Sequence, residues 1–181
     1  LYLYYFILSS NVCFAIETIT INKGILEPTP IAINQFASKY GIDQNLSELI
    51  TKVVASDLKN SGLFRPITAN AFIETTLGIE HKPLFASWRQ INASLLLNGD
   101  VVNVSRNQIR IRFVLWDTIL EQPIVAEELI LGTDLYRRAA HKIADKIYES
   151  ITGEKGYFDT KVIYISEAKQ RGQHKRMAIM D

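Results

Sequence analysis

Three consecutive segments with the alternating pattern of half-buried strands constrain the fold most. They span residues 94–104, 108–117 and 124–131, and the first two are separated by the tight-turn sequence Ser105-Arg106-Asn107. In the middle segment, the apolar positions Ile109, Ile111, Phe113 and Leu115 alternate with Arg110 and Arg112. Alternation with a period of two puts one face of a strand on a core and leaves the other partly in water. The pattern therefore predicts an antiparallel meander with one buried face.

A helix is predicted from Asn45 to Ser61. Asn45 is suited to cap it, Glu48 three residues later completes a capping box, and Gly62 supplies a left-handed exit. Its apolar positions are Leu46, Leu49, Ile50, Val53, Val54 and Leu58. They fall on one face, so we expect that face to pack on the core.

A second long helix is predicted from Asp134 to Thr152, with Thr133 as its cap and Gly153 as its end. Its apolar stripe consists of Tyr136, Ala140, Ile143, Ala144, Ile147 and Ile151. This spacing matches the helical period, so the stripe is expected to face the core. His141 falls on the opposite, polar side and is expected to be a solvated surface residue.

Shorter elements are predicted on both sides of these. The candidate strands are Ile16–Asn22, Ile31–Phe36, Leu63–Thr68, Lys161–Ser166 and Arg176–Met180, and a weaker helix spans Lys82–Ile91 with Leu84, Phe85 and Trp88 on its apolar side. The last two strands flank a polar segment, Glu167–Lys175. A two-stranded hairpin is marginally stable alone, so these strands are expected to begin a second structure.

The first 15 residues have the character of a secretory signal core. They carry no charge, and Glu17 ends the apolar run before it reaches the roughly 20 residues of a membrane-spanning helix. Cys13 and Ala15 stand where signal peptidase requires small side chains, which predicts cleavage between Ala15 and Ile16. The alternatives are a lipoprotein acylated at Cys13 and a buried strand. Because a basic start and an initiator Met are absent, the beginning of the chain is expected to be incomplete.

The charge balance excludes several classes of function. The 181 residues include 20 Lys and Arg against 19 Asp and Glu, a formal net charge of +1. General nucleic-acid binders and membrane-surface binders need a dominant positive field, which this balance does not give. The single cysteine, Cys13, excludes a disulfide framework and a cysteine-rich metal site.

No constellation of catalytic or metal-ligating residues stands out in the sequence. The histidines His81, His141 and His174 are scattered and lack the spacing of metal ligands. Glu127 and Glu128 are adjacent on a predicted strand, so they point to opposite faces and cannot act together on one substrate group. The basic run Lys169–Arg176 has no interleaved aromatic residue for stacking bases, which favours a solvated hairpin. We expect neither an enzyme nor a cofactor or metal site.

Several stretches of the chain match a known family in order and spacing. They are Pro30–Phe36, Asp57–Ile67, Trp88 and Gly99 in register, Phe113–Asp117 and, longest, Arg137–Ser166. They resemble the amino-terminal domain of the TolB family, the soluble periplasmic component of the Tol–Pal system. Gln35 stands where the family has a proline, and the connection from Trp88 to the next strand is shorter. The resemblance implies an α/β fold with helices packed on a mixed sheet, followed by the first strands of an incomplete β-propeller blade.

The resemblance also implies that the chain has three parts. Residues 1–15 would be a removed signal peptide, residues 16–153 the amino-terminal α/β domain, and residues 154–181 a linker with the first strands of the propeller. The rest of the family's six-bladed propeller is missing from this sequence, which is therefore expected to be a fragment.

By the same resemblance the protein would be a non-catalytic periplasmic interaction module that supports outer-membrane integrity and cell division. In the family the mature amino-terminal segment binds the carboxy-terminal domain of TolA, and the propeller binds the lipoprotein Pal, which gives a peripheral association with the outer membrane. The TolA-binding positions here would be Ile16, Glu17, Thr18, Ile19, Thr20, Ile21, Asn22, Lys23 and Gly24. A short β-branched strand at a free terminus is itself suited to add to a partner's sheet.

Two other functions compete with this interpretation. The family's domain resembles anticodon-binding domains of aminoacyl-tRNA synthetases, which would make it a nucleic-acid-binding module. Near-neutral charge and the export signal count against that function, and likeness of fold alone does not carry it. The second alternative is an accessory domain of a propeller peptidase, which would need a catalytic domain elsewhere.

Overall fold

The computed structural model describes residues 27–39, 44–74, 78–166 and 176–180. The strands are β1 (Thr29–Ile33), β2 (Ala37–Lys39), β3 (Phe64–Pro66), β4 (Leu95–Ser105), β5 (Gln108–Asp117), β6 (Gln122–Gly132), β7 (Val162–Ser166) and β8 (Arg176–Met180). The helices are α1 (Gln44–Asn60), α2 (Phe85–Gln90) and α3 (Tyr136–Thr152), with 3₁₀ turns η1 at Ala69–Ala71 and η2 at Thr133–Leu135. The predicted strand 16–22, the signal segment and most of the basic run 169–176 lie outside the described residues.

The main sheet is mixed, as predicted. Its order is β3-β1-β4-β5-β6, with β2 also paired to β4. β1 runs parallel to β3 and β4, whereas β4, β5 and β6 form the predicted antiparallel meander. The predicted strand 31–36 corresponds to β1, which ends at Ile33; residues 34–36 are not in a strand, and β2 follows at Ala37–Lys39. β1 and β2 pair with successive parts of β4. Between them the ring of Phe36 lies against Gly99, where any side chain would collide with it.

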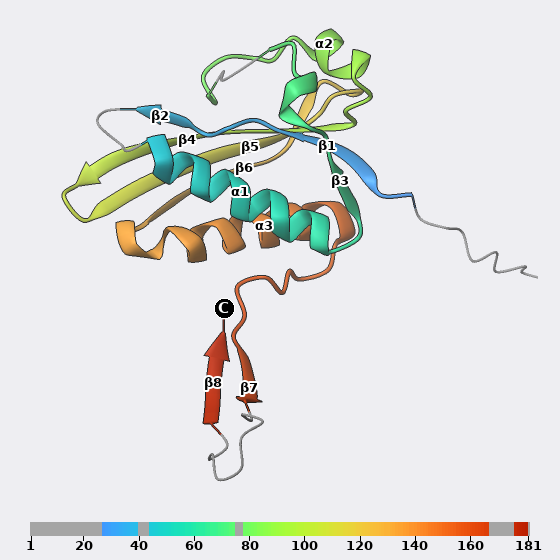
Figure 1. Ribbon diagram of the computed structural model, residues 1–181. Coiled ribbons are helices and arrows are strands. Elements are labelled where there is room, and N and C mark those ends of the chain that lie inside the picture. Colours follow the sequence, from blue (N-terminus) through green and yellow to red (C-terminus); the bar gives the residue numbers. More distant parts are fainter. Residues whose placement is uncertain (1–26, 40–43, 75–77, 167–175, 181) are drawn as a thin grey trace, which may run out of the picture.

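Helices α1 and α3 pack side by side on one face of this sheet (Figure 1). The main core fills the space between the helices and the sheet, and it includes Ile31, Ile50, Val54, Leu58, Leu97, Ile111, Phe113, Ile143 and Ile147. A smaller core, made of Ala32, Trp88, Ala93 and Leu96, forms where α2 packs on the sheet. We call the face away from α1 and α3 the open face.

Two details of α1 differ from the prediction. The helix begins at Gln44, so Asn45 lies within its first turn and does not precede it as a cap. Glu48 forms an ion pair with Lys52 at 2.5 Å instead of reaching back along the chain. Leu49 is 43% exposed, because the buried stripe of the helix passes through Ser47, Ile50, Val54 and Leu58. The left-handed exit at Gly62 is confirmed by its φ of 75°.

The start of α3 also differs. Thr133 opens η2 and makes no cap, because its hydroxyl has no hydrogen-bond partner among the described residues. Its backbone N–H donates to the Asn107 carbonyl, and the helix proper begins at Tyr136. The end at Gly153 is confirmed, with a φ of 74°. Ile151 is 38% exposed at the end of the predicted stripe.

The remaining elements largely follow the prediction. α2 is shorter than expected, and Leu84, which precedes it, is 66% exposed, whereas Phe85 and Trp88 are buried. β7 and β8 form the predicted antiparallel hairpin and pair only with each other among the described residues.

Candidate interaction surfaces

The predicted partner-binding segment, residues 16–24, lies outside the described residues. The described chain begins at Glu27 and passes at once into β1, which lies between β3 and β4. A hollow of about 500 Å³ surrounds this entry and is lined by Glu27, Pro28, Thr29, Pro30, Arg65 and Ser94. The predicted segment is therefore joined, through residues 25–28, to a strand of the sheet interior.

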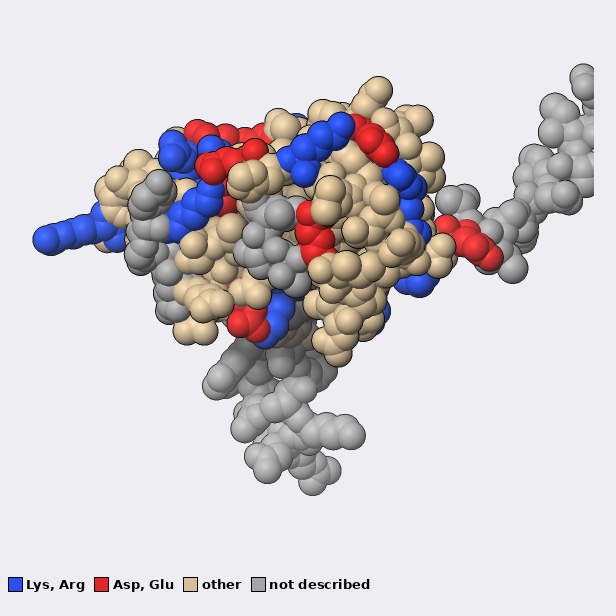
Figure 2. All heavy atoms as spheres, turned by 90° about the horizontal axis from the view of Figure 1, so that it is seen from above, with Lys and Arg blue, Asp and Glu red and all other residues tan. Residues whose placement is uncertain are grey.

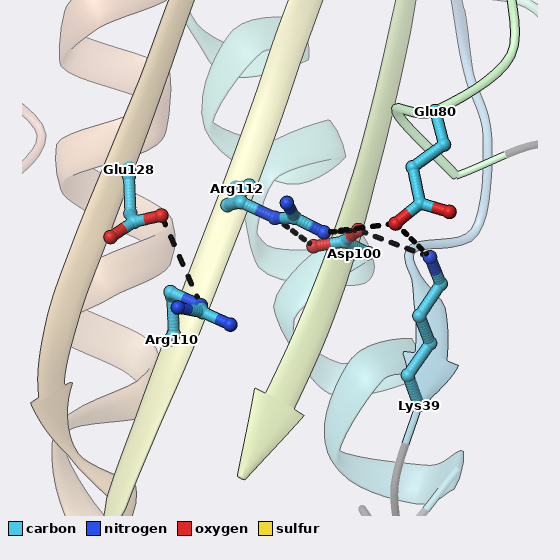
Figure 3. Close-up of polar contacts among 6 residues, drawn as sticks. All are labelled: Lys39, Glu80, Asp100, Arg110, Arg112 and Glu128. Carbon is cyan, nitrogen blue, oxygen red and sulfur yellow. Dashed lines mark hydrogen bonds and ion pairs between the residues drawn. The ribbon is translucent and has the colours of Figure 1, made fainter. Parts of the chain in front are cut away.

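A cluster of charged side chains lies on the open face (Figure 3). The side chain of Asp100 in β4 is fully buried. Arg112 of β5 donates two hydrogen bonds to its carboxylate, from Nε to Oδ1 at 3.0 Å and from Nη2 to Oδ2 at 2.6 Å. Lys39 of β2 lies 3.6 Å from the same carboxylate and 2.9 Å from Glu80. We call Lys39, Glu80, Asp100 and Arg112 the charged cluster.

The contacts within the cluster favour the ionised forms of Lys39, Glu80 and Arg112. The hydrogen bond to Glu80 raises the pKa of Lys39, and the same bond lowers the pKa of Glu80. The hydrogen bonds to Asp100 raise the pKa of Arg112. The cluster thus contains two carboxylates and two basic groups, and each basic group contacts a carboxylate within it. It thereby connects the segment that carries Glu80 to strands β2 and β5 of the sheet.

The adjacent glutamates of β6 point to opposite faces, as predicted. Glu128 lies 3.9 Å from Arg110 on the open face (Figure 3), whereas Glu127 lies 3.6 Å from Lys146 of α3. Each is therefore part of a separate ion pair, and the two share no substrate position.

His141 is buried, and its predicted surface position is wrong. It is 7% exposed, and its Nδ1 lies 2.6 Å from Oδ2 of Asp57, which joins α3 to α1. Its Nε2 is buried and has no hydrogen-bond partner among the described residues. The helical pattern placed His141 on the polar side of the helix. Its partner is 84 residues away in sequence, so local periodicity gave no sign of the contact.

This pair predicts a specific pH dependence of stability. Burial is the largest influence on Asp57 and raises its pKa above 3.8, so the folded state holds the proton more tightly than the unfolded state. Stability linked to Asp57 is therefore present at low pH and declines as the pH rises from about 3.8 through the folded-state pKa. We expect Asp57→Asn to remove this decline, measured by urea denaturation across that range. Parallel profiles for the two proteins would contradict the assignment.

The connection after α3 is bound tightly to that helix. The Asp145 carboxylate accepts the backbone N–H groups of Phe158 at 2.7 Å and Asp159 at 3.1 Å. The Nε–H of Arg138 is shared between the two carboxylate oxygens of Asp159, at 3.1 and 3.2 Å. Tyr148, Tyr157 and Phe158 pack as an aromatic group beside these bonds. The path of the chain from α3 towards β7 is thereby fixed.

The described residues carry no sign of metal chemistry or of a membrane span. None of their His, Cys, Asp and Glu side chains gather in a group of three or more suited to a metal ion. Among the same residues, no helix has the length and apolarity needed to cross a membrane. Seen from above, acidic and basic side chains lie intermixed rather than in separate areas (Figure 2).

Sequence relatives identify the family. The TolB amino-terminal domain family matches residues 17–124. A relative from Rickettsia peacockii (strain Rustic), named Tol-Pal system protein TolB, is 54% identical over 180 residues, which covers 98% of this chain and 40% of the relative. A protein of the same name from Rickettsia felis (strain ATCC VR-1525 / URRWXCal2) is 53% identical with the same coverage. The chain thus spans about 40% of the length of these relatives.

A solved structure agrees with this assignment at the level of the fold. The crystal structure of TolB from Acinetobacter baumannii matches with a TM-score of 0.65 and 22% identity, covering 76% of this chain and 32% of that one. The mixed sheet with two helices on one face is therefore a fold that TolB also has. Together with the match over residues 17–124, this establishes that the chain belongs to the TolB amino-terminal domain family.

Proposed function

We propose that this protein is a non-catalytic interaction module of the Tol–Pal envelope system that binds the carboxy-terminal domain of TolA through residues Ile16–Gly24. The observation that carries the proposal is 54% identity, across nearly the whole chain, to proteins named for that system. Residues 16–22 support the strand mechanism, because they alternate β-branched and polar side chains as an added strand requires. Their short connection to β1 supports it too, since a bound partner would be tied directly to the sheet.

The wider role follows from the same proposal. Residues 1–15 direct the chain to the periplasm and are cut off before Ile16, which frees the binding segment. Residues 16–153 form the interaction domain, and residues 154–181 connect to a β-propeller whose first strands are β7 and β8. In the whole protein that propeller engages Pal, and the system supports outer-membrane integrity and cell division. The exposed side chains of Ile163, Ile165, Met177 and Ile179 in the hairpin are what further strands would cover.

The test is calorimetric titration of the carboxy-terminal domain of TolA with two proteins. One consists of residues 16–181, and the other is the same chain beginning at Gly24. We expect the first to bind and the second to show no heat of binding. Equal binding by both would move the contact to the folded domain. Absence of binding by either would remove the TolA proposal.

Single substitutions test the strand mechanism itself. Ile19→Pro and Thr20→Pro each remove a backbone N–H and are expected to weaken binding about tenfold or more, the equivalent of about 1.4 kcal/mol. Ile19→Val and Thr20→Val are the matched controls, because they keep the N–H and a β-branched side chain. Circular dichroism should show the same fold for all four. Normal binding by the proline variants would exclude strand addition.

A further inference from the structure

β6 forms one edge of the main sheet. It is 11 residues long and pairs with β5 on one side, and no other strand among the described residues pairs with its second side. Alternate residues of such a strand direct their N–H and C=O groups away from the sheet, where they are available to another strand. The opposite edge, β3, has only three residues. β6 is therefore the edge with room for an additional long strand.

A groove runs between this edge and α3. Its volume is about 460 Å³, and its walls include Glu127 and Leu129 from β6 and Lys142 and Lys146 from α3. Lys155 belongs to the connection that Asp145 holds against α3, and that connection also lines the groove. An edge strand facing a helix across a groove is the arrangement in which extended peptides bind by strand addition.

The charges of the groove favour one kind of peptide. Each of its acidic side chains is already engaged: Glu127 and Glu149 share Lys146, Asp145 accepts two backbone N–H groups, and Asp159 accepts from Arg138. Lys142 and Lys155 are exposed and have no ion-pair partner among the described residues. The two charged groove side chains that lack a partner among the described residues are thus cationic, which suits acidic side chains on the incoming strand.

The open face contributes an apolar contact at the same edge. Ile130 follows Glu128 by two residues, so both point to the open face, and Ile130 is 57% exposed. A strand paired with β6 would bring every second side chain beside Ile130 and Glu128. Apolar or β-branched residues at those positions would cover Ile130, while the alternate positions would face α3 and its lysines.

We propose that β6 and α3 form a second partner site, which binds an extended acidic segment of another protein as an additional strand of the sheet. Acidic side chains on the α3 side of the strand meet Lys142 and Lys155, and β-branched side chains on the other side cover Ile130. The site goes beyond the proposed TolA contact and does not depend on residues 16–24.

The experiment uses a synthetic peptide that alternates valine with glutamate, titrated into the isotope-labelled chain and followed by the amide signals of β6 and α3. We expect residues 122–132 and the Lys142 region to shift on binding. The double variant Lys142→Glu/Lys155→Glu is expected to lower the affinity at least about tenfold and to prefer the matching valine–lysine peptide. Position 142 lies one turn of α3 from both Arg138 and Lys146, so a glutamate there gains basic neighbours and the helix is preserved.

Arg65→Glu is the matched control, because Arg65 is an exposed residue on β3 at the opposite edge. It should leave the affinity unchanged. The proposal would be overturned if the peptide shifted amide signals only in other elements. It would also be overturned if the double variant Lys142→Glu/Lys155→Glu bound the valine–glutamate peptide with the affinity of the unchanged protein. The proposal would also be overturned if the amide signals of β6 shifted only in the chain that begins at Gly24. In that case the protein's own terminal segment would be the occupant of the edge.

Discussion

Replacing Arg112 with leucine is expected to lower the free energy of unfolding by about 3 kcal/mol or more. Arg112 gives two hydrogen bonds to Asp100, whose side chain is fully buried, and its own side chain is 27% exposed. Without the guanidinium, only Lys39 at 3.6 Å still faces that carboxylate among the described residues. A buried charge that loses its main partner costs far more than a surface pair contributes. Urea denaturation at neutral pH measures the change.

The matched control is Arg110→Leu, two residues earlier on the same strand and face. Arg110 lies 3.9 Å from Glu128, and both side chains are more than one third exposed. Its loss is expected to cost less than about 1 kcal/mol. The double variant Asp100→Leu/Arg112→Leu should be more stable than Arg112→Leu alone, because it leaves no buried charge at this position. If Arg112→Leu and Arg110→Leu were equally stable, the charged cluster would contribute nothing beyond a surface pair.

Trp88→Ala is expected to lower the free energy of unfolding by about 3–5 kcal/mol. Trp88 is 1% exposed, stacks edge-on against Phe72 with ring centroids 5.1 Å apart, and occupies the centre of the smaller core. Its Nε1–H donates to the Glu74 carboxylate at 2.8 Å. The alanine variant therefore creates a cavity and removes a donor from Glu74 at once.

Trp88→Phe separates these two effects. Phenylalanine keeps an aromatic ring in the core but cannot donate to Glu74, so a loss of about 1–3 kcal/mol is expected, smaller than that of alanine. Both variants should retain the far-ultraviolet circular dichroism of the main sheet and long helices, because α1 and α3 pack on the other face. Equal losses for the two variants would show that the hydrogen bond, rather than packing, dominates at this position.

The parts of the fold that sequence patterns predicted well are those with local signals. The meander was predicted from the alternation of apolar and polar residues, because every second residue of a strand with one buried face is apolar. The ends of α1 and α3 followed from Gly62 and Gly153, both of which adopt the left-handed conformation. Strand order gave no such signal. Nothing local in Thr29–Ile33 shows that β1 pairs in parallel with β3 and β4.

The errors share a physical cause, which is contact between residues distant in sequence. The helical pattern places His141 on the polar side of its helix, whereas its contact with Asp57 of another helix belongs to the buried interior. Leu49 was assigned to the core because its helix has a wider apolar stripe than the neighbouring elements cover. The sequence patterns did not single out Asp100, because its significance depends on Arg112 and Lys39, which lie on other strands. The predicted segment 16–24 lies outside the described residues and stays a prediction.

The position of β1 also determines how the domain carries mechanical load. A pull applied at Glu27 along the strand acts on a strand bonded to β3 on one side and to β4 on the other. Both ladders are then loaded in shear, and their hydrogen bonds must yield together. An edge strand pulled across its ladder would instead lose its bonds one after another. A partner bound to the segment before β1 is therefore tethered at a mechanically resistant point, so tension is transmitted to the whole sheet without peeling a strand from it.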